Sequence, residues 1–552
     1  MRFTKKVITI LLCMACLFTA MPVFGAEISP YAKALNVLGM LRGTEKGYEL
    51  DRVPTRAEIL VMIIRMLGKE QDALLQSFPH PFCDTQWEDP YVSYGYNHGI
   101  VKGVSADSFG GSQQASLNQY CTMLLRVLGY DDAKGDFSYE NAVSFATLVL
   151  GEGLTAEKFD RGEMAEITCH ALNTRIKGNT KTLGQTLAEQ GVFSQQQFID
   201  AQRYWEQNDE YTSTTVLIYT VGSDLESQQG RLTNDLNEIL RAAPKENCSV
   251  LLQTGGTLQY QNEWMTNGKA ERFRVMKSDL QKEESHIATK ACEAQTLTDF
   301  IEWGAEEAPA ERYILVLWDH GYGIKGGFGA DELNQNKTIP VSEISTAIMK
   351  AGVFFDIIAF DACLMGTVET AYALRNQTKY LIASEQATPA CGLYYTTWLG
   401  ALERNPAITT QRLGRVILDS FSLHAGIEAN IPTTISIMDV SRAETLVNQM
   451  SLFSGDLLNV KETVELLGKN EGIFDQFDLL SIMDGTPQIT AAAQALAYEV
   501  RNSSAADQYC GTAIYVPAYK PEDFSVMKEE LKKIGFNQTY LHMIATGITV
   551  EE

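Results

Sequence analysis

The carboxy-terminal part of the sequence alternates short apolar runs with longer segments whose apolar residues recur at helical spacing, starting near Thr214. Short runs rich in β-branched and aromatic residues are typical of strands, and their alternation with helical segments is typical of a parallel sheet covered by helices. The pattern therefore predicts an α/β domain over residues 212–552, with a largely parallel sheet flanked by helices. The expected strands are Thr215–Val221, Ser249–Gln253, Tyr313–Trp318, Phe355–Asp361, Tyr380–Ala383, Thr433–Met438 and Thr512–Val516.

A tight turn is expected at Asn267-Gly268, because these residue types adopt the positive φ angles that a two-residue hairpin requires. The flanking segments Leu258–Met265 and Glu271–Met276 would then pair as antiparallel strands. We expect this hairpin to lie apart from the main sheet.

The amino-terminal part, residues 27–175, contains an imperfect repeat of two helices joined by a glycine-punctuated turn. In the first copy a turn at Leu38–Gly43 precedes a helix that ends at Arg65–Gly68. The second copy has the same turn at Gly99–Gly103 and ends at Arg126–Gly129, and a third, more divergent copy follows. The pattern predicts a mostly helical repeat domain.

The start of the second helix is marked by capping residues. In the first copy Thr55 is followed three residues later by Glu58, which is the pattern of a capping box. The third copy, from about Phe137 to Thr174, keeps Arg161-Gly162-Glu163 before its helix. The polar, glutamine-rich segment 176–211 that follows is expected to be a partly helical connector between two domains.

Residues 1–26 have the pattern of an export signal. Basic residues at Arg2, Lys5 and Lys6 precede the apolar run Val7–Phe18, and the small residues Gly25-Ala26 follow. The apolar run is shorter than the roughly 20 residues that a membrane-spanning helix needs. The segment therefore predicts an exported chain with no membrane span after the signal is removed.

Composition narrows the classes of function. With 552 residues, 45% of them hydrophobic and 21% charged, the chain can bury more than one core and is not of disordered composition. The net charge of −24 argues against nucleic-acid binding, which depends on positive charge. Two of the ten cysteines lie within residues 1–26, and the other eight have no CxxC or other metal-ligand spacing, so we expect no metal site and no required cofactor.

Two of the expected strands end in residues that can do chemistry. Asp319-His320-Gly321 follows Tyr313–Trp318, and Ala362-Cys363 follows Phe355–Asp361. In an open parallel sheet the carboxyl ends of neighbouring strands meet at one crevice, so His320 and Cys363 are expected to meet there.

A cysteine between a strand and a helix start feels the positive end of the helix, which favours the thiolate. A neighbouring histidine can take its proton and later return one to a leaving amine. The backbone N–H groups of Gly321 and Cys363 are candidates for binding a tetrahedral oxyanion. Each residue alone also has a simpler interpretation: a strand-end cysteine is often part of the core, and a lone histidine is often a structural residue.

The segments Trp318–Gly323 and Phe360–Gly366, together with Glu369, resemble the paired signatures of the clostripain family of cysteine peptidases, which are relatives of caspases, legumain and gingipains. The resemblance covers roughly residues 212–520. It implies a caspase-like fold, a catalytic pair formed by His320 and Cys363, and cleavage after Arg or Lys. A calcium requirement, which some relatives have, rests on the resemblance alone.

The resemblance also implies an acidic specificity pocket. Asp361 matches a motif position implicated in that pocket, and an alternative role for it is to cap the following helix. The segment Ala387–Gly392 contains no Asp or Glu that could be the family's second pocket acid, and the nearest acid is Glu385. Asp224 also lies at the carboxyl end of an expected strand, but a role in a turn or a helix cap explains it at least as well. Some relatives are cut between the histidine and cysteine strands, and Lys325 or Lys337 would be the matching site here.

The amino-terminal repeats resemble S-layer homology modules, which hold exported proteins on secondary cell-wall polymers. Arg56 and Arg161 match the basic residues of those modules, whereas the second copy departs from them at Leu117-Asn118-Gln119. The resemblance implies wall-polymer binding through the two arginines. The alternative is that the two arginines are solvated charges at helix starts in a purely structural helical domain.

The sequence thus predicts a secreted, cell-wall-associated cysteine endopeptidase of a Gram-positive-type bacterium, acting on protein or peptide substrates after Arg or Lys. Two alternatives remain open. One is a non-catalytic wall-binding surface protein, and the other is a cysteine amidase that acts on wall peptides.

Overall fold

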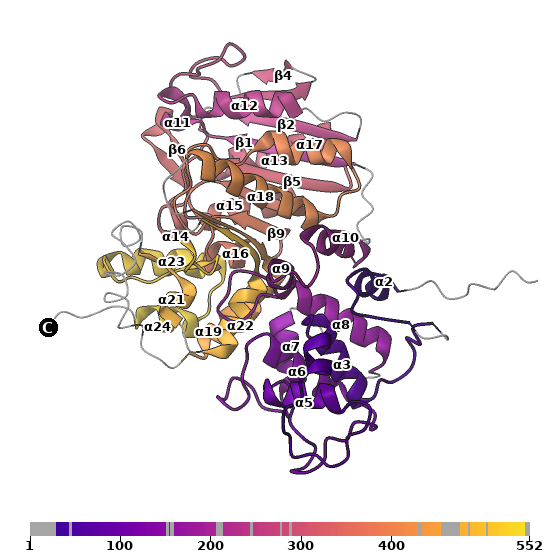
Figure 1. The fold of residues 1–552 in the computed structure, drawn as a ribbon. Coiled ribbons are helices and arrows are strands. Elements are labelled where there is room, and N and C mark those ends of the chain that lie inside the picture. The colour runs from indigo at the N-terminus through magenta and orange to yellow at the C-terminus, as the bar shows by residue number, and fades with distance from the viewer. Residues whose placement is uncertain are drawn as a thin grey trace, which may run out of the picture.

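The computed structural model describes residues 29–43, 47–150, 154, 159–205, 213–242, 247–276, 279–285, 290–428, 433–453, 457, 475–483, 486–503 and 506–546. The expected export segment 1–26 lies outside these residues. A helical part, called the repeat part below, ends with α10 (Gln195–Trp205), and a part built on a large sheet, called the sheet part, follows it (Figure 1). None of the described helices is long and apolar enough to cross a membrane.

In the repeat part, the second helix of each copy starts at a capping side chain. Thr55, Ser116 and Asp160 each accept hydrogen bonds from backbone N–H groups in the first turn of α3, α6 and α8. Glu58 completes the expected capping box with Thr55. The helices of this part are α2 Pro30–Val37, α3 Arg56–Met66, α4 Glu70–Leu75, α5 Asp89–Asn97, α6 Leu117–Val127, α7 Ala142–Leu150, α8 Arg161–Asn173, α9 Leu183–Glu189 and α10.

The sheet part contains a mixed sheet of nine strands in the order β12-β10-β9-β8-β5-β1-β2-β3-β4. The five central strands, β9 to β2, run parallel, and the two strands at each end pair antiparallel. The expected α/β class is confirmed. The strands are β1 Thr214–Thr220, β2 Cys248–Thr254, β3 Glu271–Met276, β4 Asp279–Ser285, β5 Arg312–Trp318, β8 Phe355–Asp361, β9 Thr378–Ala383, β10 Thr434–Asp439 and β12 Ala497–Asn502.

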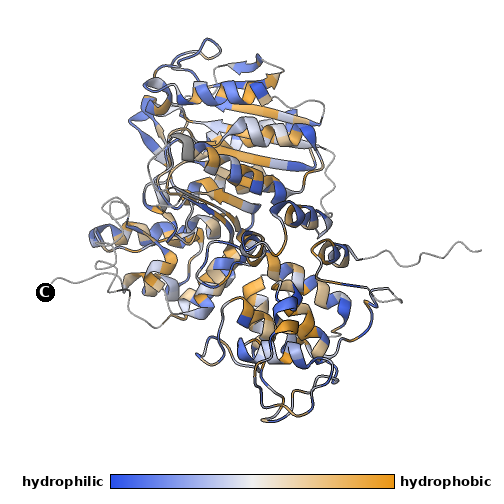
Figure 2. Ribbon diagram, viewed as in Figure 1, coloured by the Kyte–Doolittle hydropathy of each residue, from blue (hydrophilic) through white to orange (hydrophobic). Residues whose placement is uncertain are grey.

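Helices cover both faces of this sheet. Successive side chains of a strand point to opposite faces, so each central strand contributes to a core on both sides. In β5, Ile314 and Val316 belong to the core under one set of helices, and Leu315 and Leu317 to the core under the other. Figure 2 shows hydrophobic residues along the central strands. The helices of the first set are α12 Arg231–Ala242, α17 Tyr395–Arg404 and α18 Thr410–Glu428; those of the second are α13 Ala294–Glu307, α15 Val341–Ala351, α16 Val368–Leu374, α19 Ala443–Ser451, α22 Pro487–Leu496, α23 Phe524–Ile534 and α24 Gln538–Ala545.

The expected separate hairpin at Asn267-Gly268 is wrong. Leu258–Met265 contains no strand, and β3 pairs with β2 and β4 inside the main sheet. The reason is that side chains take the backbone N–H groups of this segment: the Asn267 side chain accepts from Tyr260 at 2.8 Å, and the Glu226 carboxylate accepts from Gln261 at 2.7 Å.

The expected strand Thr512–Val516 also lies elsewhere. Its central residues form β13 (Ala513–Tyr515), which pairs with β11 (Gln476–Asp478) in a separate two-stranded sheet. The main sheet ends instead with β12, whose alternating charged residues Glu499 and Arg501 gave no apolar run for a sequence pattern to detect.

Candidate active site

His320 and Cys363 lie at the same edge of the sheet. Strands β5 and β8 are parallel neighbours with Trp318 opposite Asp361, and each candidate residue follows two positions after its strand. The connection between the strands runs through a small hairpin, β6 (Phe328–Asp331) and β7 (Lys337–Ile339), and then α15. The parallel register therefore brings the two strand ends together as the sequence predicts.

The two strand ends lie very close together at Gly321. A Cβ atom added to Gly321 would lie 1.9 Å from the carbonyl oxygen of Cys363, closer than any real contact. The segment is fixed by two further bonds, from the Gly329 N–H to the His320 carbonyl and from the Tyr322 N–H to the Gly327 carbonyl, each at 2.9 Å. Glycine is thus required at position 321 by the distance between the strand ends.

The Cys363 thiol contacts Thr388, a residue that the sequence gave no reason to single out. The backbone N–H of Thr388 donates to the Cys363 sulfur at 3.2 Å, and the Thr388 hydroxyl lies 3.3 Å from it. A donor of this kind stabilises a thiolate more than a neutral thiol. Leu364, the next residue, has a φ of 64°, and its N–H donates to the Gln386 carbonyl in the same loop. A non-glycine residue in this region of φ carries backbone strain, which is common beside reacting groups.

The helix expected directly after Cys363 begins later. Helix α16 starts at Val368 and is capped by the Thr367 side chain, which accepts from the Thr370 N–H. The expectation that Cys363 opens this helix is therefore wrong, and so is the alternative role of Asp361 as its cap. Thr388 supplies the donor that the helix terminus was expected to provide.

His320 is oriented by Asp224. The His320 Nε2 atom lies 2.7 Å from a carboxylate oxygen of Asp224, in the short helix α11 (Ser223–Ser227) after β1. A carboxylate in this position fixes the orientation of the ring and stabilises it when it is protonated. The sequence placed Asp224 at a strand end but gave a turn role equal weight. The contact with His320 requires β1 and β5 to be neighbours.

Asp361 is the last residue of β8, two positions before Cys363. One carboxylate oxygen accepts from the Leu393 N–H at 3.0 Å and the other from the Tyr395 hydroxyl at 2.8 Å. Burial raises the pKa of Asp361 to about 6. Gly392 has a φ of 58°, and a Cβ there would lie 2.6 Å from the Asp361 carboxylate, so the loop passes very close to this acid.

A second buried acid lies on this side of the sheet. Asp235 of α12 accepts a hydrogen bond from the Trp318 indole nitrogen at 2.7 Å. Burial, with a contribution from the negative charge of Asp361, raises the pKa of Asp235 well above its ordinary value. The sequence gave no signal for Asp235, because it belongs to a helix more than 100 residues before the loop after β9 in which the resemblance places a second acid. Glu385 is buried and accepts from the Gly511 N–H at 2.7 Å.

Arg56 and Arg161 are buried between repeats. Arg56 donates to the carbonyl oxygens of Phe109 and Lys102 in the second copy, at 3.0 and 2.6 Å. Arg161 donates to the carbonyl of Tyr48 in the first copy at 3.0 Å. In the second copy Leu117 stands at the position of these arginines, and the next residue, Asn118, donates to the carbonyl of Tyr139 in the third copy. These bonds join the three copies in a ring. A role of the two arginines in polymer binding stays a prediction.

Lys325 and Lys337 differ in their surroundings. Lys325 lies in α14 (Gly323–Gly326), and its ammonium group is 2.9 Å from both the buried Asp475 and Asp523. Lys337 is exposed beside a turn in which Gln335 and Asn336 both have positive φ. Lys337 is therefore the more accessible of the two lysines.

Among the described residues, one buried group of potential metal ligands lies close together: Glu385, Asp478 and Cys510. The Asp478 carboxylate already accepts from the Cys510 N–H at 2.6 Å and from the Ser481 N–H at 2.8 Å. These bonds give the group a structural role, as a link between β11 and the segment before β13.

The fold and the crevice define a mixed α/β protein with a cysteine and a histidine at the carboxyl edge of its parallel strands. The model of the clostripain family matches residues 218–515, more than half of the chain. The chain therefore belongs to the clostripain family.

Individual relatives match different parts of the chain. Clostripain of Hathewaya histolytica is 22% identical over 293 residues, which are 43% of this chain and 55% of that protein. The middle cell wall protein of Brevibacillus brevis is 33% identical over 165 residues, 29% of this chain and 16% of that protein. The chain thus spans little more than half of one relative and a small part of the other. A secreted C11 cysteine protease from Bacteroides thetaiotaomicron has a TM-score of 0.47 at 19% identity, and the match covers 58% of this chain and 99% of that chain.

Proposed function

We propose that this protein is a cysteine endopeptidase that uses His320 and Cys363. The observation that supports it most is their position at the ends of adjacent parallel strands, with the Gly321 backbone against the Cys363 carbonyl and Asp224 at the Nε2 atom of the His320 ring. Membership of the clostripain family supports the same activity.

The reaction follows from these groups. His320 takes the Cys363 proton, and the thiolate attacks the peptide carbonyl carbon to form a carbon–sulfur bond. The N–H groups of Gly321 and Cys363 are the proposed donors to the resulting oxyanion. His320 then protonates the leaving amine as the C–N bond breaks. Water, deprotonated by His320, cleaves the thioester and releases the carboxylate and the free thiol. Side chains supply every proton transfer, so we propose that catalysis needs no cofactor. A calcium requirement is an expectation from resemblance, and activity in excess chelator is its test.

We further propose that Arg or Lys precedes the cleaved bond. Asp361 supports this specificity, because it is a buried carboxylate whose hydrogen-bond partners in the described structure are neutral. A cationic substrate side chain would supply the missing counter-charge. Asp235 adds a second buried carboxyl group on the same side of the sheet.

A panel of fluorogenic peptides ending in Arg, Lys, Asp or Asn, cleaved under reducing conditions, tests both proposals. Release of dye after Arg and Lys alone supports them, and equal cleavage after all four would remove the specificity. The absence of cleavage with every peptide would favour a non-catalytic surface protein. Cleavage of wall peptides alone would favour an amidase.

We also propose that the protein is exported and associated with the cell wall. The repeats and their similarity to cell-wall and surface-layer proteins support this location. Sedimentation of the chain with purified Gram-positive wall fragments tests it, compared with Arg56→Met and Arg161→Met. If the arginines bind the polymer, both variants lose binding while remaining folded.

Self-cleavage after Lys337 is a further proposal, supported by the exposure of this lysine and the turn before it. Wild-type protein should then give two bands on a denaturing gel, and Cys363→Ala and Lys337→Gln should each give one. A fully active wild type that stays one band contradicts it.

A further inference from the structure

A buried glutamine joins two segments of the candidate active site. Gln476 is the first residue of β11, which pairs with β13 outside the main sheet. Its amide nitrogen donates to the carbonyl oxygens of Leu364 and Glu385, each at 3.0 Å. Leu364 directly follows Cys363, and Glu385 lies in the loop after β9 that also contains Thr388. The amide therefore links the cysteine segment to the loop that contacts its sulfur.

The same part of β11 also contacts the segment that follows His320. A Cβ atom added to Gly323, which has a φ of 62°, would lie 2.1 Å from the Gln476 amide oxygen. The neighbouring Asp475 carboxylate is 2.9 Å from the ammonium group of Lys325, in the helix α14 that Gly323 begins. The segments after β5, β8 and β9 thus all meet two consecutive residues of the chain.

The backbone of Leu364 is fixed from both sides. Its φ of 64° is a conformation that a non-glycine residue keeps only where its surroundings fix it. Its N–H donates to the Gln386 carbonyl at 3.0 Å, and its carbonyl accepts from Gln476. These two bonds orient the peptide groups before and after Leu364, and the first of these groups contains the Cys363 carbonyl that lies against Gly321.

The loop after β9 depends on the same amide. Three residues beyond Glu385, the Thr388 N–H donates to the Cys363 sulfur at 3.2 Å. The bond from Gln476 to the Glu385 carbonyl keeps the start of this loop beside the cysteine segment. A movement of the loop away from that segment would remove the donor from the sulfur.

A second buried glutamine shows what is unusual about Gln476. Gln494 of α22 donates through its amide nitrogen to the carbonyl oxygens of Ile176 and Asn179, at 3.0 and 3.3 Å, and its amide oxygen accepts from the Tyr130 hydroxyl. The Gln476 amide oxygen has no partner among the described residues. A buried polar atom without a partner lowers stability and is rare. Such local conflicts are expected at functional sites more than in structural cores.

We propose that Gln476 is a positioning residue of the active site. It fixes the backbone that follows Cys363 and the loop that donates to the Cys363 sulfur, and so keeps the nucleophile in place for attack. Gln476 is only 3% exposed and donates to backbone carbonyls, so it acts through these two segments. The inference rests on the proposed peptidase function, because it gives Gln476 a role in the same reaction.

The test compares Gln476→Met with Gln494→Met, which is the matched control. Each variant replaces a buried amide with a side chain of similar length and removes two bonds to backbone carbonyls. Gln476→Met should lower kcat for a fluorogenic Arg peptide by about 100-fold and leave KM nearly unchanged, because the reacting groups are displaced while the substrate still binds. Gln476→Ala, which leaves space at the site, should also lower kcat and serves if methionine does not fit.

Gln494→Met should lower the melting temperature at least as much as Gln476→Met, because it also loses the bond from Tyr130. Its kcat at 25 °C should stay near that of wild type. Stability and activity are thereby separated, since a glutamine with a structural role alone would affect only the first.

Alkylation by iodoacetamide tests the same role without a peptide substrate. The rate at Cys363, followed by mass spectrometry of the peptide that contains it, should be about tenfold lower at pH 7 in Gln476→Met and unchanged in Gln494→Met, because a lost donor to the sulfur reduces the thiolate fraction. If wild type cleaves no peptide, the proposed function fails, and alkylation still decides whether Gln476 positions the thiol. Wild-type kcat in Gln476→Met, alkylation as fast as in wild type, or an equal loss of kcat in both variants would each overturn the inference.

Discussion

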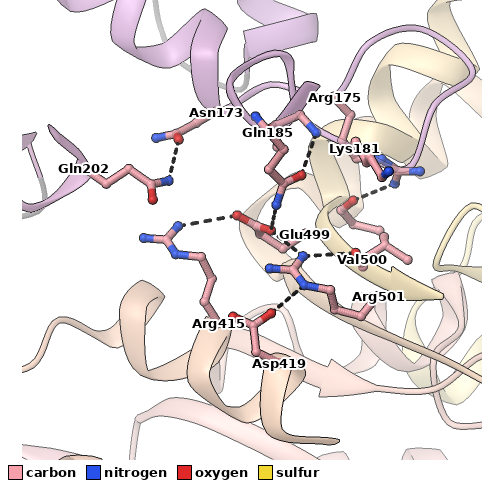
Figure 3. A network of polar contacts seen from close by, with 12 residues as sticks. Asn173, Arg175, Lys181, Gln185, Gln202, Arg415, Asp419, Glu499, Val500 and Arg501 are labelled. Atoms are coloured by element: carbon pink, nitrogen blue, oxygen red, sulfur yellow. Dashed lines mark hydrogen bonds and ion pairs between the residues drawn. The ribbon is translucent and has the colours of Figure 1, made fainter. Parts of the chain in front are cut away.

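Two buried carboxylates in the sheet part have opposite surroundings. Glu499 of β12 is paired with Arg415 at 3.5 Å and Arg501 at 2.9 Å, as Figure 3 shows. Asp361, the last residue of β8, has a backbone N–H and a tyrosine hydroxyl as its hydrogen-bond partners in the described structure. Burial alone would raise the pKa of both groups. The arginines outweigh it for Glu499, whose pKa is lowered, whereas the pKa of Asp361 is raised to about 6.

Their different surroundings distinguish Glu499, an acid with a structural role, from Asp361, for which we propose a role in substrate binding. At β12 the protein supplies the counter-charge itself, so the ion pairs hold the sheet edge to α18 and, through Gln185, to the repeat part. Among the described residues no cation pairs with Asp361, and under the proposed specificity a substrate cation neutralises its charge. We expect substitutions in the crevice to change activity and substitutions at β12 to change stability.

The largest expected effect lies in the crevice. Cys363→Ala and His320→Ala should each lower kcat/KM by about 10⁴-fold or more, since nucleophile and base act as one unit. The melting temperature should change little, because neither side chain belongs to a described core cluster. Turnover of a fluorogenic Arg peptide and thermal unfolding measure the two quantities. Wild-type-like turnover in either variant would refute the mechanism.

The largest effect on stability is expected at β12. Glu499→Gln leaves two arginines with no full counter-charge and should lower the free energy of unfolding by about 3 kcal/mol. The peptidase kcat at 25 °C should stay near that of wild type. Denaturant unfolding followed by fluorescence gives the first value. Loss of kcat in the folded variant would show that the two regions are coupled.

Gly321→Ala probes how tightly the strand ends must approach. The new Cβ would lie 1.9 Å from the Cys363 carbonyl, so one strand end must move. A displacement of about 1 Å near reacting groups costs on the order of 100-fold in rate. We expect a loss of that size in kcat, with KM nearly unchanged. Gly352→Ala, at a helix end where a Cβ meets nothing within 4 Å, is the control for a general cost of replacing glycine.

The parts of the site that the sequence revealed are those fixed by a single strand end. His320 and Cys363 each follow an apolar run, and a parallel register brings such ends together whatever the loops do. The sequence indicated Gly321 because it directly follows His320, but the close approach to the Cys363 carbonyl that requires a glycine is visible only in the structure. The α/β class followed from the same runs.

The residues that the sequence missed reach the site through tertiary packing. Thr388 contacts Cys363 only because its loop folds back over β8, and Asp235 comes from a helix on one face of the sheet. The errors in the strands have a related cause. The backbone N–H of Gln261 is taken by Glu226, far along the chain, so a local turn signal gave the wrong pairing.

The smallest expected effect is the pH dependence of cation binding by Asp361. It tests the comparison between Asp361 and Glu499 most directly. Agmatine, an arginine without its carboxylate, should bind to Cys363→Ala protein at neutral pH. Below pH 6 its affinity should fall by about tenfold per unit, because Asp361 is then protonated in the free protein. Asp361→Asn should bind agmatine at least about tenfold more weakly at pH 7.5, with no such pH dependence.

The same two carboxylates should affect stability with opposite signs. The raised pKa of Asp361 means that the folded state holds a proton which the unfolded state has lost, so its contribution to stability falls as pH rises from about 4 to 6. The lowered pKa of Glu499 means that its contribution is present above the unfolded pKa and is lost as pH falls through the folded pKa. Relative to wild type, Asp361→Asn should therefore gain stability between pH 4 and 6, whereas Glu499→Gln should lose it as pH rises. Urea unfolding of both variants from about pH 3 to pH 6 measures the slopes, because the contribution of Glu499 changes below the unfolded pKa of a glutamate and that of Asp361 above the unfolded pKa of an aspartate. Slopes of the same sign would contradict the distinction between the two acids.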